Sequence, residues 1–101
     1  MKISTLGALA LALTLLASAA SASNFPPSPE AAVQAAERAC AETGEPEAAC
    51  MARRRQLAGG VLDYVATAAP RLVAICEADY RDPIKQAWCA VHGLDQLAAS
   101  R

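Results

Sequence analysis

Large apolar side chains are scarce in this chain, and that scarcity restricts its possible folds more than any other feature. Of the 101 residues 54% count as apolar, but alanine supplies much of that share. A small domain that buries little large apolar surface is marginally stable unless it is crosslinked. The chain has four cysteines, an even number. We therefore expect one small domain held together by disulfide bonds.

The first 22 residues have the composition of a secretory signal peptide. Lys2 precedes an unbroken run of apolar and small residues from 3 to 20, and an Ala-Ser-Ala triplet ends at Ala22. Cleavage is expected after Ala22, with Ala20 as the alternative. An uncleaved anchor is the less favoured interpretation, because residues 3–20 are at the short limit for a membrane span and include four hydroxyl side chains. We expect a periplasmic or secreted protein with no stable membrane insertion after cleavage.

The rest of the chain predicts an all-α domain. Residues 23–28 are interpreted as a linker, because Pro26 and Pro27 favour extended backbone. Residues 29–101 then form the helical domain, since no alternating run of β-branched residues is found there.

Two helix starts are marked by a capping side chain followed by proline, at Ser28-Pro29 and at Asp82-Pro83. They predict helices from 29 to about 43 and from 83 to about 99. Gly59-Gly60 lies inside the intervening helical pattern, where paired glycines destabilise a helix, so close helix approach or a bend is expected there.

Residues 47–80 predict either one long helix bent at Pro70 or two helices that break there. Nine residues fall within a stripe about 120° wide on a helical wheel, and the stripe keeps its phase across Pro70. This favours three helices with a Pro-kinked central one, and four short helices are the alternative. We expect the stripe to face the core, flanked by Met51, Leu62 and Val73. The stripe consists of Cys50, Leu57, Val61, Tyr64, Val65, Ala68, Leu72, Ile75 and Cys76.

The cysteine positions predict how the helices are joined. Cys40 and Cys50 are equally far from the first break, and Cys76 and Cys89 are equally far from the second. Residues equally far from the tip of an antiparallel hairpin lie side by side. We therefore expect Cys40 bonded to Cys50 and Cys76 to Cys89, although four cysteines permit three pairings. Cys89 lies off the apolar face of its helix, so a free or intermolecular thiol there is the alternative.

Cys89 and His92 form the one pair with metal-binding chemistry, because their i, i+3 spacing puts them on one helix face. A zinc site needs four ligands, and this chain has a single histidine. We expect no metal and no cofactor, with a site at these two residues as the alternative.

Arg53-Arg54-Arg55 is the only dense charge cluster. Consecutive helix positions fan over about 200°, so the three side chains do not share one anion. The favoured interpretation is ion pairing with Glu42, Glu45 and Glu47, and an anionic partner surface is the alternative. With 9 basic and 10 acidic residues, no positive excess favours nucleic-acid binding.

No motif for a nucleophile, an oxyanion donor or a phosphate-binding glycine loop is found, so we do not expect an enzyme. The sequence favours an exported small helical binding or accessory protein that acts through a protein partner. It defines neither that partner nor the oligomeric state. The alternative is a thiol- or metal-handling periplasmic protein that uses Cys89 and His92.

Overall fold

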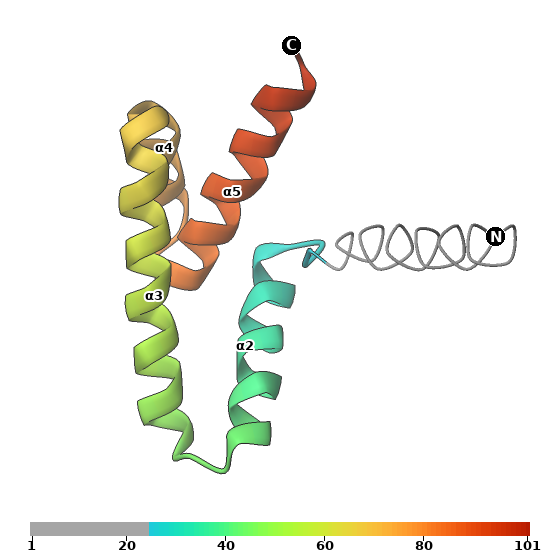
Figure 1. The fold of residues 1–101 in the computed structure, drawn as a ribbon, viewed down its shortest axis with the longest axis vertical. Coiled ribbons are helices and arrows are strands. Elements are labelled where there is room, and N and C mark those ends of the chain that lie inside the picture. Colours follow the sequence, from blue (N-terminus) through green and yellow to red (C-terminus); the bar gives the residue numbers. More distant parts are fainter. Residues whose placement is uncertain (1–24) are drawn as a thin grey trace, which may run out of the picture.

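The computed structural model describes residues 25–101, so the expected signal peptide at 1–22 lies outside the described residues. Within that range the chain forms four helices and no strand, which confirms the all-α class (Figure 1). None of the four combines the length and the apolar character needed to cross a bilayer. The helices are α2 (Pro29–Thr43), α3 (Glu47–Ala68), α4 (Pro70–Asp79) and α5 (Pro83–Ala99).

The expected helix starts at 29 and 83 are confirmed, together with their capping side chains. The Ser28 hydroxyl accepts a hydrogen bond from the Ala31 N–H at 3.1 Å, and an Asp82 carboxylate oxygen accepts one from the Ile84 N–H at 2.9 Å. Each cap pairs a backbone donor that has no partner inside the helix. At the other end of α2, Gly44 has a φ of 75°, a left-handed conformation that glycine adopts without strain.

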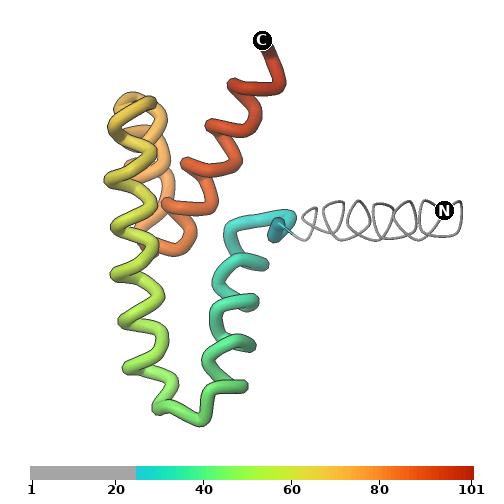
Figure 2. Tube along the Cα trace, in the orientation of Figure 1, coloured from blue at the N-terminus to red at the C-terminus, as the bar shows by residue number. Residues whose placement is uncertain are grey.

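Residues 68–70 correct the expected three-helix count in favour of the four-helix alternative. Ala69 leaves the helical region, with φ −143° and ψ 68°, because a residue before proline is disfavoured from helical geometry. Pro70 then begins α4, where its missing N–H removes no helical hydrogen bond. The chain reverses at this point, and α4 packs against both α3 and α5 (Figure 2).

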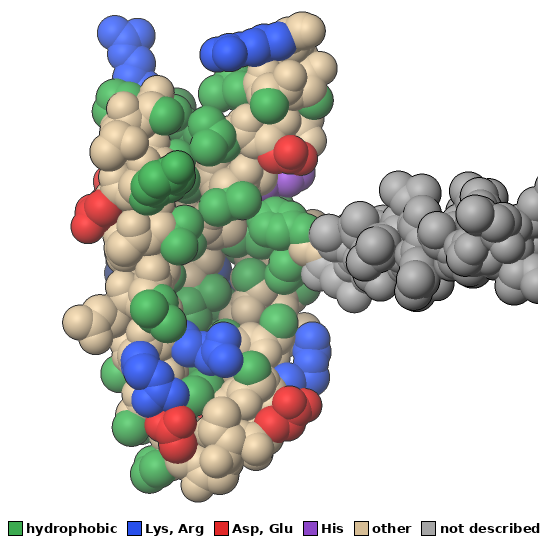
Figure 3. Space-filling view, in the orientation of Figure 1, with side chains coloured by type: hydrophobic (Ala, Val, Ile, Leu, Met, Phe, Trp, Pro, Cys, Tyr) green, Lys and Arg blue, Asp and Glu red, His purple; other side chains and the backbone are tan. Residues whose placement is uncertain are grey.

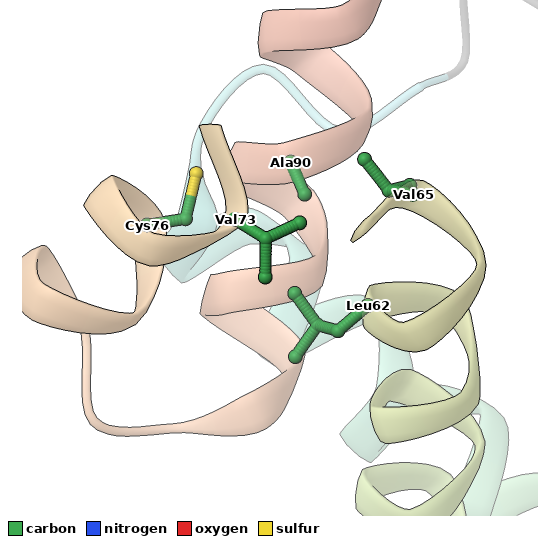
Figure 4. Packing of buried hydrophobic residues seen from close by; sticks show 5 residues of the cluster. All are labelled: Leu62, Val65, Val73, Cys76 and Ala90. Atoms are coloured by element: carbon green, nitrogen blue, oxygen red, sulfur yellow. The ribbon is translucent and has the colours of Figure 1, made fainter. Parts of the chain in front are cut away.

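Two clusters of buried residues hold the helices together. In the first cluster, α2 meets the start of α3 beside α5. In the second cluster, the end of α3 meets α4 and α5 (Figure 4). The first cluster consists of Ala36, Cys40, Cys50 and Met51, and the second of Leu62, Val65, Val73, Cys76 and Ala90.

The structure corrects the expected orientation of α3. Leu57 and Tyr64, in the predicted core stripe, are 65% and 77% exposed, whereas Met51 and Leu62, in the predicted flank, are 5% and 6% exposed. The buried face is therefore turned by about 60 to 70° from the predicted one, at 100° per residue. Helices approach most closely where side chains are small, and Ala58 lies on the face that is buried.

Ile75 in α4 requires the same correction. It belongs to the predicted core stripe but is 58% exposed. Of the nine stripe residues, three are buried: Cys50, Val65 and Cys76.

Candidate partner-binding groove

Two disulfide bonds join the helices in the predicted pairing, Cys40 to Cys50 and Cys76 to Cys89, with Cα atoms 5.7 and 5.6 Å apart. Among residues 25–101 no cysteine is free. Cys89 contacts the second cluster although the helical wheel directed it outward. The start of α5 lies among three other helices, so every residue from 82 to 90 is at least partly buried. A helix enclosed on several sides has no single apolar face, so its position on a helical wheel does not decide whether Cys89 is buried.

The Cys89 and His92 pair does not offer two metal ligands in this structure. The Cys89 sulfur is bonded to Cys76, and the His92 ring stacks on Trp88 with ring centroids 4.7 Å apart. In the described part of the chain, no three histidine, cysteine or carboxylate side chains lie close enough to hold a metal ion.

The three consecutive arginines are separated by the structure. Arg53 donates two hydrogen bonds of 2.8 Å to the Glu45 carboxylate. This hydrogen bond, more than the charge attraction, lowers the pKa of Glu45 from its ordinary value. Arg55 contacts Asp82 at 3.5 Å across the second turn, a partner that sequence proximity did not indicate. Of the predicted partners of the cluster, Glu45 is confirmed.

Arg54 is the member of the cluster that faces a groove. None of the three ion pairs found among residues 25–101 includes Arg54, and its side chain is partly buried. The groove lies where α2, α3 and α5 meet and has a volume of about 320 Å³. Apart from Arg54 its lining is apolar: Ala32, Ala35, Ala36, Leu57, Ala58, Val61, Ile84 and Ala87.

The edge of the groove on α3 continues into an exposed apolar surface. Leu57 and Val61 line the groove and are 65% and 39% exposed, and Tyr64 follows one turn later along the helix. Figure 3 shows apolar side chains gathered along the seam between α3 on the left and α2 and α5 on the right. Contiguous apolar surface that a small domain leaves uncovered is a feature of binding sites.

The paired glycines of α3 are not explained by the packing of the described chain. A Cβ atom built at Gly59 or Gly60 would meet no atom within 4 Å, and neither residue has a positive φ. The expected close helix approach is therefore not found at these glycines within residues 25–101. Gly60 is exposed and lies next to Val61 on the edge of the groove.

The end of the predicted linker is attached to α5. Trp88 donates a 2.7 Å hydrogen bond from its indole N–H to the carbonyl of Pro26, and the Phe25 ring stacks parallel to the indole with centroids 6.0 Å apart. Sequence reasoning missed this contact because it joins residues separated by 62 positions. The groove was missed as well, although the i, i+3, i+4 spacing of Ala32, Ala35 and Ala36 was a usable signal.

Comparison with known proteins adds no relative: no family model, no curated protein and no solved structure matches this chain.

Proposed function

We propose that this chain is an exported helical binding or accessory protein that acts through a protein partner and has no catalytic activity of its own. The observation that carries the proposal is the apolar groove between α2, α3 and α5, together with the exposed side chains along its edge. A protein in water gains stability by covering such a surface, and a partner supplies the cover.

The disulfides further support the proposal. Three of the four bonded cysteines are buried and Cys89 is partly buried, and such bonds persist in oxidising compartments outside the cytosol. The alternative function in thiol or metal handling has less support, because Cys89 carries no thiolate while it is bonded to Cys76.

Site-specific photocrosslinking in the native compartment tests the proposal. The full precursor is expressed with a photoreactive amino acid at Leu57 or Tyr64, and at exposed Gln34 of α2 as the control. We expect one and the same protein to be crosslinked from Leu57 and Tyr64 and not from Gln34. Absence of any crosslink from the α3 positions, or equal crosslinking from Gln34, contradicts the proposal.

A further inference from the structure

We propose that the groove binds an amphipathic α-helix of the partner, which places an apolar row against the alanine side chains and a carboxylate against Arg54. The inference rests on the proposed function and names the kind of segment that the partner contributes.

The lining of the groove favours a helix over other peptide conformations. Apart from Arg54, the lining side chains offer no hydrogen-bond donor or acceptor. A bound segment must therefore pair its own backbone N–H and C=O groups, and a helix does so internally. Residues 25–101 contain no strand, so an extended peptide finds no sheet edge with which to pair.

The size of the lining side chains permits close approach by a helix. Ala32, Ala35 and Ala36 follow one another on one face of α2, and Leu57 and Val61 face them one turn apart on α3. Interaxial distances between packed helices depend on the side chains at the contact, and alanine allows short ones. Large apolar side chains of the bound helix then fill the groove, spaced i, i+3, i+4 and i+7.

The charge of the groove selects the polar residues of that helix. Arg54 is the one charged residue of the lining, and no carboxylate lines the groove. Arg53 and Arg55 are held by Glu45 and Asp82, so Arg54 is the member of the cluster left to meet a ligand. A guanidinium that is partly withdrawn from water forms its strongest hydrogen bonds with a carboxylate. The bound helix is therefore expected to carry Asp or Glu beside its apolar row.

Two synthetic helical peptides test this complementarity. Both are 16 residues long and carry leucine at i, i+3, i+4 and i+7. One has glutamate beside the leucine row, and the other has lysine at the same positions. Their affinities for the oxidised protein, purified from its export compartment, are measured by titration calorimetry at low salt. We expect the glutamate peptide to bind about fivefold more tightly than the lysine peptide.

The decisive experiment reverses the charge of Arg54 on the protein. Arg54→Glu is expected to invert the preference, so that the lysine peptide binds more tightly. Arg71→Glu is the matched control, because Arg71 is an exposed arginine of α4 outside the groove, and it should leave the preference unchanged. Circular dichroism and intact disulfides verify that each variant is folded.

A second pair of variants tests where the peptides bind. Ala35→Leu fills the groove and should weaken binding of the glutamate peptide about tenfold, because overfilled contacts force side chains apart. Ala41→Leu, on an exposed position of the same helix, should have no effect.

The proposal is overturned if neither peptide binds, if Arg54→Glu leaves the preference unchanged, or if Ala35→Leu and Ala41→Leu act alike. Such a result alongside crosslinking from Leu57 would reject the helical occupant and keep the proposed function. The expected peptide results without any crosslinked protein would support the chemistry of the groove and reject the proposed function.

Discussion

The two disulfide-linked hairpins of this molecule are closed in similar ways but stabilised differently. In the α2 to α3 hairpin the bond between Cys40 and Cys50 lies in a cluster whose one large apolar side chain is Met51. In the α4 to α5 hairpin the other disulfide lies in a cluster that also contains Leu62, Val65 and Val73. The first hairpin therefore depends more on its covalent bond, and the second more on packing. The weaker packing of the first hairpin accompanies the open groove beside α2.

Removal of each disulfide in turn should have the largest effect on stability. It tests whether the two hairpins depend on their disulfides to different degrees. Cys40→Ala with Cys50→Ala is expected to lower the free energy of unfolding by about 3 kcal/mol, from the loop entropy of the unfolded chain. Because Met51 is the one large side chain buried beside this bond, the amide protons of α2 should also lose protection from hydrogen exchange. Cys76→Ala with Cys89→Ala should destabilise to a similar extent while α4 and α5 keep partial protection. The comparison fails if α2 stays as protected as α5 after the first pair of substitutions.

The buried face of α3 is tested by two leucine truncations. Leu62→Ala removes a side chain that is 6% exposed from the second cluster, and we expect a loss of about 2 to 3 kcal/mol in the free energy of unfolding. Leu57→Ala removes a side chain that is 65% exposed and should change stability by less than about 0.5 kcal/mol. Urea denaturation measures both. If Leu57→Ala lowered the free energy of unfolding more than Leu62→Ala, α3 would have the orientation that the helical wheel predicts.

Two glycines distinguish the tightly packed contact between α4 and α5 from the exposed face of α3. A Cβ atom at Gly93 would lie 2.6 Å from the Leu72 Cδ1 atom, so Gly93→Ala should displace Leu72, and that cost should cancel the gain of about 1 kcal/mol that alanine brings to a helix. Gly60→Ala meets no atom and should raise the free energy of unfolding by about 1 kcal/mol through helix propensity. Chemical denaturation of the two variants measures the difference, and equal shifts would contradict this account.

The smallest effect is expected at the turn of the first hairpin, where Arg53 lowers the pKa of Glu45 below its ordinary 4.5. The contribution of this pair to stability is complete above that ordinary value and is lost as the pH falls through the lower folded pKa. Arg53→Gln should raise the pKa of Glu45 and reduce the loss of stability in acid. Carboxyl titration followed by NMR checks the shift, with Arg55→Gln as a control that leaves Glu45 unchanged.

Local signals in the sequence predicted the ends of elements well. The caps at Ser28 and Asp82 and the symmetric cysteines each depend on residues within one hairpin, and each is found as expected. The number of helices depended on Pro70, where phase continuity of the stripe competed with the steric exclusion of Ala69 from helical geometry, and the steric effect prevailed.

Tertiary features were harder to predict for a physical reason. α3 carries two adjacent apolar strips, and the sequence favoured the one with Leu57 and Tyr64. The structure buries the one with Met51, Ala58 and Leu62, because the neighbouring helices α2, α4 and α5 pack on that side, and a helical wheel of one helix contains no information about its neighbours. The groove is formed by three helices, and its position depends on which face of α3 is buried. A helical wheel of one helix therefore does not predict the groove.

The contact between Trp88 and the segment at Phe25 and Pro26 gives the molecule an intrinsic spectroscopic probe. Trp88 is the single tryptophan of the chain, so all indole fluorescence originates where the start of the described chain meets its last helix. Its emission therefore reports the docking of that segment directly, in a stopped-flow or thermal experiment, without an attached dye.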